Sequence, residues 1–234
     1  YGSYALRLGI IASRSPGQHQ AFSTDRVIAG RNFCNKLWNI ARFITDKLGE
    51  EPTIGEPEPK SLADHWIIHE LSEAKATIDR TLAGYRFAEA SDSLYHAVWD
   101  SVADWYIEAS KSEDNPNMLA WVLTTSLKLA HPFAPFVTET IWQTLPWTNS
   151  LLINEAWPTM PEYSQISAGQ FGQLQSLISE IRFLSAALPG NDRYTLICYK
   201  DSLIEDNAAL IGRLGKLGGI ERTEQPRGIR LAVS

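Results

Sequence analysis

The chain has 234 residues, of which 44% are apolar and 8 are tryptophan, so it can bury one large core or two small ones. Its formal net charge of −6 argues against binding nucleic acid through overall charge, but allows a local basic face. No apolar run reaches the length of a membrane span, no secretory signal is present, and Cys34 and Cys198 lie outside any Cys-x-x-Cys pair. We therefore expect a cytoplasmic protein without membrane contact, disulfides or a metal cluster. We also expect it to be a monomer.

Apolar side chains at helical spacing, interrupted by glycine, proline and capping residues, predict a series of long helices with short connections. In chain order these are a short helix within residues 1–20, a long helix from 24 to 48, helices at 61–82, 87–105, 116–130 and 135–145, and a later helix at 171–188. Ser23 and Asn115 stand at N-cap positions. Ser61 forms a near capping box with Asp64, and Gly49 follows the end of the long helix.

The C-terminal part of the chain changes in composition and predicts a small α/β unit. Its expected elements are a strand at 194–199, a helix at 203–217 and a strand at 228–233, with a glycine pair at 218–219 between the last two. The sequence therefore predicts a mainly α protein, in which a bundle of about five helices precedes the α/β unit. The expected segments are 1–20, the bundle at 21–147, an irregular linker at 148–167 and the α/β unit at 168–234.

Two lines of side chains run along the long helix. The core-facing line contains Phe33, Leu37, Ile40, Ile44 and Leu48. A second line with the same spacing contains Asn32, Lys36, Asn39 and Phe43, with Arg31, Asn35 and Arg42 beside it. Residues 26–45 include four basic residues and no acidic one. Because cations contact phosphates, amides read base edges and rings stack on bases, this helix predicts binding to single-stranded nucleic acid.

Four sequence blocks, in a fixed order, resemble the valyl-tRNA synthetase family of class I aminoacyl-tRNA synthetases. They are YGSYALR at 1–7, GRNFCNKLWN at 30–39 continuing to 43, YRFAEA at 85–90 leading to DWYIE at 104–108, and HPFAPFVTETIW at 131–142. The first resembles the segment after the ATP-handling KMSKS loop, although Ser3 and Tyr4 depart from the family pattern. The other three resemble the anticodon-binding bundle, and the second favours the valyl enzyme over its isoleucyl and leucyl relatives.

This resemblance implies that the chain recognises the anticodon arm of a tRNA and works with a catalytic domain of the same polypeptide. The expected RNA-binding residues are Lys36, Arg42 and Phe43, with Arg31, Asn32, Asn35 and Asn39 near them. The chain has no His-x-Gly-His motif and no KMSKS loop, so we expect no catalytic residue or cofactor in it, with ATP and Mg²⁺ acting in the catalytic domain. Residues 1–20 would then be the remnant of the linker after that domain.

Other interpretations of these residues are open. The three asparagines could bond to neighbouring helices, Arg31 could pair with an internal carboxylate, and Lys36 and Arg42 could belong to a solvated helix face with Phe43 in the core. The chain could also be the bundle of an isoleucyl, leucyl or methionyl enzyme, a helical protein-interaction module, or a free-standing enzyme. An open basic face edged by Phe43 would favour RNA binding, whereas cations paired with carboxylates would favour an interaction module.

Two further pairs of residues have spacings that occur in functional sites. His65 and His69 are four apart, as in some zinc sites, but no third ligand lies nearby in the sequence. Asp104 and Glu108 are expected on a solvated or salt-bridged helix face, where Arg86 or Arg42 could be a partner, rather than as a catalytic acid and base. Neither pair therefore predicts an active site.

Overall fold

The computed structural model describes residues 2–12, 23–188, 193–199, 201–224, 228–229 and 231. Across these residues the protein is mainly α-helical with one small sheet, which confirms the predicted fold class. The chain divides into two compact units, Tyr1–Tyr163 and Ser164–Ser234. The four segment limits expected from the sequence stay predictions. Within the described ranges, no helix combines the length and the apolar character that a membrane crossing requires.

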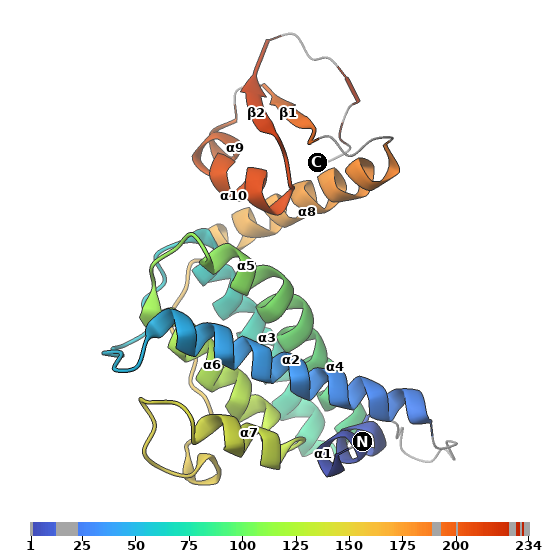
Figure 1. Cartoon of the computed structure of the whole chain (residues 1–234), viewed down its shortest axis with the longest axis vertical. Helices are drawn as coiled ribbons and strands as arrows, with labels where there is room; N and C mark the ends of the chain where they lie inside the picture. The colour runs from blue at the N-terminus through green and yellow to red at the C-terminus, as the bar shows by residue number, and fades with distance from the viewer. Residues whose placement is uncertain are drawn as a thin grey trace. The chain divides into compact units, whose positions relative to one another are not determined.

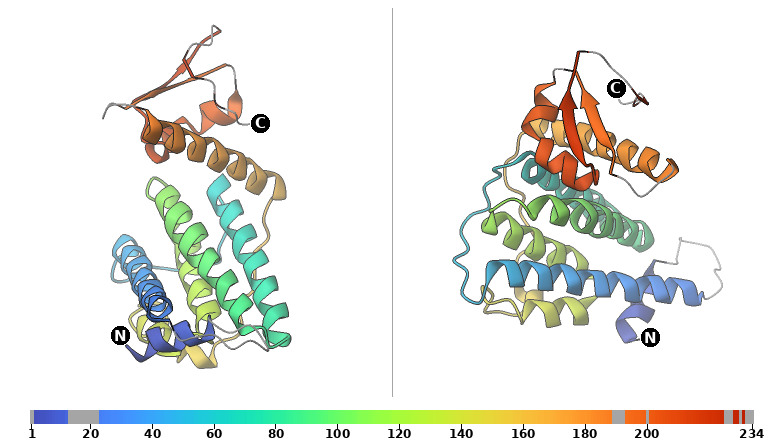
Figure 2. Two further views of the ribbon diagram at one scale, coloured as in Figure 1. Left: turned by 90° about the vertical axis from the view of Figure 1, so that its right-hand side faces the viewer. Right: turned by 45° about the horizontal axis from the view of Figure 1, so that its top comes forward.

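The first unit is a bundle of helices (Figure 1). Its elements are α1 (Ser3–Ile11), α2 (Thr24–Leu48), α3 (Leu62–Ala83), α4 (Phe87–His96), η1 (Ala97–Tyr106), α5 (Ile107–Ser110), α6 (Pro116–Ala130), α7 (Pro135–Trp142) and η2 (Leu152–Asn154). The rod formed by α4, η1 and α5 packs against α3 and contacts α2 through η1 (Figure 2). Helix α6 packs against α2 and α3, and α7 follows it. Ser15, Pro16 and Gly17, which predict a turn after the first helix, lie outside the described residues.

Helix α2 buries the predicted core line. The residues of this line that are at most 4% exposed are Phe33, Leu37, Ile40 and Ile44. Leu48 is half-buried, and Gly49, with a φ of 82°, ends the helix as predicted. Ser23 occupies the N-cap position without a side-chain cap bond. Helix α1 crosses α2 closely, because a Cβ on Gly30 would lie only 2.8 Å from the carbonyl oxygen of Ala5.

The predicted helix at 87–105 is not a regular α-helix in its second half. Its backbone forms a ten-residue π-helix, η1, between α4 and α5. Hydrogen bonds in a π-helix join residues five apart, which brings such residues towards one side of the helix. Trp99 and Asp104 are five apart, and both contact Lys36 of α2. The apolar spacing of 87–105 predicts that Phe87 faces the core, but this is wrong, because its side chain is 48% exposed and contacts the ring of Tyr85.

A buried carboxylate joins three elements of the bundle. Asp64 is 1% exposed at the start of α3, where it completes the predicted capping box with Ser61. It also accepts hydrogen bonds from Tyr106 Oη at 2.7 Å and from Asn115 Nδ2 at 2.8 Å. Burial, together with this carboxylate, raises the pKa of Tyr106 well above its usual value. Asn115 stands at the predicted N-cap position of α6, but its side chain makes no cap bond.

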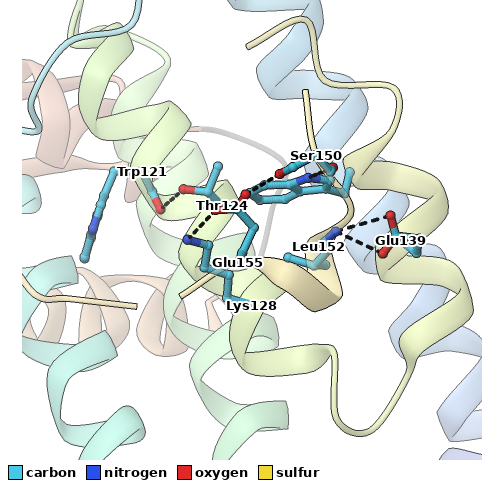
Figure 3. Close-up of polar contacts among 8 residues, drawn as sticks. Trp121, Thr124, Lys128, Glu139, Ser150, Leu152 and Glu155 are labelled. Carbon is cyan, nitrogen blue, oxygen red and sulfur yellow. Dashed lines mark hydrogen bonds and ion pairs between the residues drawn. The ribbon is translucent and has the colours of Figure 1, made fainter. Parts of the chain in front are cut away.

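Polar contacts hold the irregular chain after α7 against the bundle (Figure 3). The carboxylate of Glu139 accepts a hydrogen bond from the backbone N–H of Leu152 at 3.1 Å. Glu155 accepts one from the hydroxyl of Ser150 and lies 3.4 Å from the ammonium of Lys128. These two contacts, the hydroxyl first, lower the pKa of Glu155. The segment is therefore a fixed part of the first unit.

The second unit combines helices with a two-stranded parallel sheet (Figure 2). Its elements are α8 (Gln165–Ala187), β1 (Thr195–Cys198), α9 (Ser202–Asp206), α10 (Ala208–Leu214) and β2 (Gly219–Arg222). Thr195 of β1 lies opposite Gly219 of β2. Two helices connect the strands, as a parallel pair requires a long crossover. The predicted α/β character is therefore confirmed for the described residues.

Several element limits of the second unit differ from the prediction. The second strand is at 219–222 rather than 228–233, and residues 228, 229 and 231 are not in a strand, while the rest of that segment lies outside the described residues. The helix predicted at 203–217 is divided at Asn207. Helix α8 begins six residues before the predicted start, since Ser164 caps it by accepting a bond from the backbone N–H of Ser167.

Candidate nucleic-acid interface

One side of α2 is open to solvent and carries the predicted polar residues. The exposed residues of this side, called here the α2 face, are Arg31, Asn32, Asn35, Trp38, Asn39 and Arg42. They recur at intervals of three and four, so they form one strip along the helix. Residues 26–45 contain no acidic side chain, so the strip has a positive formal charge. The α2 face therefore combines cations, amides and one indole ring.

The side chains of the α2 face make few contacts with the rest of the bundle. Arg42 is exposed and has no side-chain hydrogen bond or ion pair with any described residue. Asn35 and Asn39 likewise make no side-chain hydrogen bond within the described ranges, so they do not tie α2 to other helices. Arg31 donates to Asn32 Oδ1 at 3.4 Å, a contact within the strip itself. Most of the polar groups on this side are therefore available to a ligand.

Lys36 lies on the flank of the α2 face that contacts η1. Its Nζ is 2.9 Å from Oδ1 of Asp104 and 4.6 Å from the centroid of the Trp99 ring. The side chains of the lysine and the aspartate are 27% and 50% exposed. An ion pair that is this exposed contributes about 0.2–1 kcal/mol, so a phosphate can compete for the lysine. Phe43 follows two turns later on the same flank and is half-buried.

An aromatic stack supports this flank from inside the bundle. The buried ring of Phe33 in α2 stacks on Tyr95 of α4, with 5.8 Å between the ring centroids. Tyr95 in turn stacks on Trp99 of η1 at 5.4 Å. Burial and two nearby aspartates raise the pKa of Tyr95. Lys36 thus stands at the outer end of a stack that begins in the core, so packing fixes the ring beneath its ammonium.

Two histidines of the bundle have opposite electrostatic environments. His96 on α4 is exposed, and its Nδ1 lies 2.7 Å from a carboxylate oxygen of Asp100. This hydrogen bond raises the pKa of His96 above its ordinary value. His131, after α6, is half-buried against Thr138, and burial lowers the pKa of its ring. Neither ring lies on the α2 face.

A pocket of about 310 Å³ opens where α1, α2 and α4 meet. Its wall includes Arg26, Phe33, Asp92 and Tyr95, so it borders the aromatic stack. Its ionisable groups are one guanidinium, one carboxylate and one phenol. Among the described residues that line it, no histidine or cysteine stands beside the carboxylate of Asp92.

The remaining candidate residues have structural partners. His69 Nδ1 lies 3.0 Å from the hydroxyl of Tyr163, and the described residues contain no group of three side chains that could hold a metal ion. Glu108 pairs with Lys111 at 2.6 Å, and Asp104 pairs with the lysine of α2. Neither candidate arginine pairs with these carboxylates, because Arg86 pairs with Glu89 and Arg42 pairs with no described residue. Both are salt-bridged, as the solvated interpretation predicted.

The structure brings all seven predicted RNA-binding residues to one side of α2 or its flank. Five of them are on the α2 face, while Lys36 and Phe43 lie on the flank towards η1. The open cation at Arg42 agrees with the RNA interpretation, whereas the paired Lys36 agrees with the interaction-module interpretation. Sequence reasoning gave no role to Trp38, which lies between Asn35 and Arg42 at helical spacing. Extending that spacing by one step would have found it.

Comparison with known proteins identifies the family. A model described as the anticodon-binding domain of tRNA ligase matches residues 64–188. The chain belongs to this family. The matched residues include α3 to α8 and begin after α2, so the α2 face lies outside that match.

Curated relatives extend the similarity to most of the chain. Valine–tRNA ligase of Geobacillus stearothermophilus is 37% identical over 198 residues, which cover 78% of this chain and 22% of the relative. The Staphylococcus epidermidis and Bacillus cereus enzymes of that name are 38% identical, covering 69% and 80% of this chain and 20% and 23% of the relatives. This anticodon-binding chain thus spans about a fifth of the length of the curated relatives it matches.

A solved structure shares the fold. It is a LeuRS of Agrobacterium radiobacter in a ternary complex with tRNA and LeuAMS, with a TM-score of 0.56 and 15% sequence identity. The alignment covers 95% of this chain and 28% of the other. At this level of identity the similarity concerns the fold alone.

Proposed function

We propose that this chain recognises the anticodon arm of valine tRNA as part of a valine–tRNA ligase. The observation that carries the proposal is the family match, combined with relatives named valine–tRNA ligase that are similar over most of the chain. The α2 face supports it, because exposed arginines, amides and an indole are the groups that bind an unstacked RNA loop. Such a role belongs to protein synthesis in the cytoplasm.

The physical role of the module is remote positioning. Contacts to the anticodon arm contribute binding free energy that selects the correct tRNA and orients its acceptor end at a catalytic domain. ATP and Mg²⁺ would act in that catalytic domain, and we assign no residue of this chain to them. Losing the anticodon contacts is therefore expected to weaken tRNA binding and discrimination without changing the activation of valine.

Within the proposed interface, Arg42 and Lys36 contact phosphates and the amides contact base edges. Arg42 is exposed and unpaired among the described residues, so it can bind a phosphate without losing an internal contact. Lys36 must exchange Asp104 for the phosphate, which costs little because the ion pair is exposed. Phe43 forms the apolar edge of the site.

A binding titration tests the proposal. The 234-residue chain is mixed with valine tRNA and with isoleucine tRNA, and affinity is measured by fluorescence anisotropy at several salt concentrations. The double variant Lys36→Ala/Arg42→Ala is expected to bind valine tRNA more weakly, with the salt slope reduced by about 1.4–1.8, since two cations are lost. Arg80→Ala on α3 is the matched control, because it removes an exposed arginine outside the interface.

The alternatives predict different results. If the chain binds isoleucine tRNA at least as tightly as valine tRNA, the specificity belongs to another synthetase of this class. If it binds both tRNAs no more tightly than a control hairpin, the interpretation as a helical interaction module is favoured. The ion pair between Lys36 and Asp104 agrees with that interpretation. If the double variant and Arg80→Ala weaken binding equally, the α2 face is not the interface.

A further inference from the structure

Trp38 is an exposed tryptophan without a partner in the described part of the chain. It is 43% exposed at the middle of α2. Its indole nitrogen has no hydrogen-bond acceptor and its ring stacks on no described aromatic or cationic group. Three other tryptophans, by contrast, donate from Nε1 to nearby oxygens. These are Trp121 to Thr159, Trp142 to Ser150 and Trp157 to Asp79.

The surroundings of Trp38 are polar. On the α2 face the neighbours one helical turn away are Asn35 and Arg42, and the adjacent residue Asn39 is also exposed. A tryptophan side chain on a helix leans towards the N-terminus, which places this ring over the turn that contains Asn35. An apolar protein partner would need apolar neighbours around the ring, and this strip provides amides and a guanidinium instead. A nucleotide fits the strip better, because it has a flat base with hydrogen-bonding edges and a phosphate.

We propose that Trp38 is the stacking platform for one unpaired base of the RNA that this chain binds. The indole packs against the face of the base, the amide of Asn35 reaches its edge, and Arg42 binds the adjoining phosphate. This assignment rests on the proposed tRNA function and adds to it a residue and a mode of contact. It also gives a role to the 43% of a large apolar side chain that the fold leaves exposed.

Stacking predicts a specific pattern among variants of the full chain. Replacing Trp38 with alanine should weaken binding of a hairpin with the valine anticodon loop by about 5- to 150-fold, the range measured for a lost base stack. Trp38→Tyr keeps a ring and should retain most of the affinity. Because no charge is lost, the salt slope should stay unchanged, unlike that of Arg42→Ala. Phe136→Ala is the matched control, since Phe136 is a 67% exposed aromatic residue on α7.

A second RNA completes the test. Hairpins in which single loop nucleotides are replaced by abasic sites are titrated against the parent chain and Trp38→Ala. For the stacked position, the abasic hairpin should bind the parent weakly, and Trp38→Ala should cause no further loss. Circular dichroism of each variant confirms that α2 remains folded.

The outcomes separate the two proposals. The stacking role is supported if Trp38→Ala weakens binding of the intact hairpin but does not change the affinity for the hairpin with one particular abasic position. Equal binding by Trp38→Ala and the parent, while Arg42→Ala still weakens it, overturns the stacking role and leaves the tRNA function standing. If Trp38→Ala lowers the affinity for every abasic hairpin by the same factor, the stacking role is also overturned. If the parent binds the hairpin no better than an unrelated one, both proposals are wrong.

Discussion

Replacing Asp64 with alanine is expected to destabilise the first unit strongly. The carboxylate is 1% exposed and accepts hydrogen bonds from Tyr106, Asn115 and the backbone N–H groups of Lys60 and Ser61. A hydrogen bond to a charged group contributes about 1.5–3 kcal/mol, and the two side-chain donors are the buried ones. The backbone N–H groups of Lys60 and Ser61 belong to residues that are not buried, so water can replace the carboxylate as their acceptor. The substitution should therefore cost about 3–5 kcal/mol, mostly from the tyrosine and the asparagine left without an acceptor.

Urea unfolding followed by tryptophan fluorescence measures this loss. All 8 tryptophans lie in the first unit, so the signal is not mixed with unfolding of the second. With a slope of about 2 kcal/mol per molar urea, the midpoint should fall by about 1.5–2.5 M. Tyr106→Phe removes one of the two buried donors and should give about half that shift.

Glu73→Ala provides the control, since Glu73 is an exposed residue of α3 away from the cap. Its free energy of unfolding should match that of the parent within about 0.5 kcal/mol. The reasoning fails if Asp64→Ala unfolds at the same urea concentration as Glu73→Ala. It also fails if Tyr106→Phe costs more than Asp64→Ala, because the tyrosine contributes only one of the carboxylate's contacts.

Three further predictions follow from single contacts. Asp104→Asn should release Lys36 and tighten binding of the anticodon hairpin by up to about five-fold, whereas weaker binding in anisotropy would mean that the ion pair positions the lysine. In NMR titrations His131 should titrate below and His96 above the ordinary histidine range. The stability that the neutral His131 contributes is lost as the pH falls through its lowered pKa. The stability that the protonated His96 contributes is lost as the pH rises through its raised pKa. Cys34, whose pKa burial raises to about 12, should react with a thiol reagent only after unfolding.

The sequence was sufficient to predict those helices whose apolar period and capping residues lie within one short segment. The period of Phe33, Leu37, Ile40 and Ile44 requires one buried side of α2, and the structure buries it. The capping box at Ser61 likewise depends on four consecutive residues. The π-helix was not predictable in this way, because its residues have the same apolar spacing as an α-helix. What distinguishes η1 is its packing against α3 and α2, which a local pattern does not contain.

The limits of the sequence prediction follow from long-range contacts. The sequence predicts the second strand at 228–233, whereas the strand that pairs with β1 is β2 at 219–222. At the site, helical spacing placed Lys36 correctly on α2. Its partner Asp104 is 68 residues away in the sequence, so no spacing rule could predict the ion pair. Trp38 was missed although it shares the helical spacing of Asn35 and Arg42, because the sequence alone does not show that its side chain is 43% exposed.

The net negative charge of the chain limits where RNA can bind and favours the α2 face. A net charge of −6 repels RNA from most of the surface, and at physiological salt this repulsion acts over about 8 Å. RNA can therefore approach more closely at a cation that no described carboxylate pairs with, as at the exposed Arg42 of α2. Binding at so few cations is weak and little helped by electrostatics, so specific contacts such as base stacking must supply the selectivity. In a ligase that also holds the acceptor arm, the second contact becomes intramolecular, and a weak but selective anticodon site is then enough.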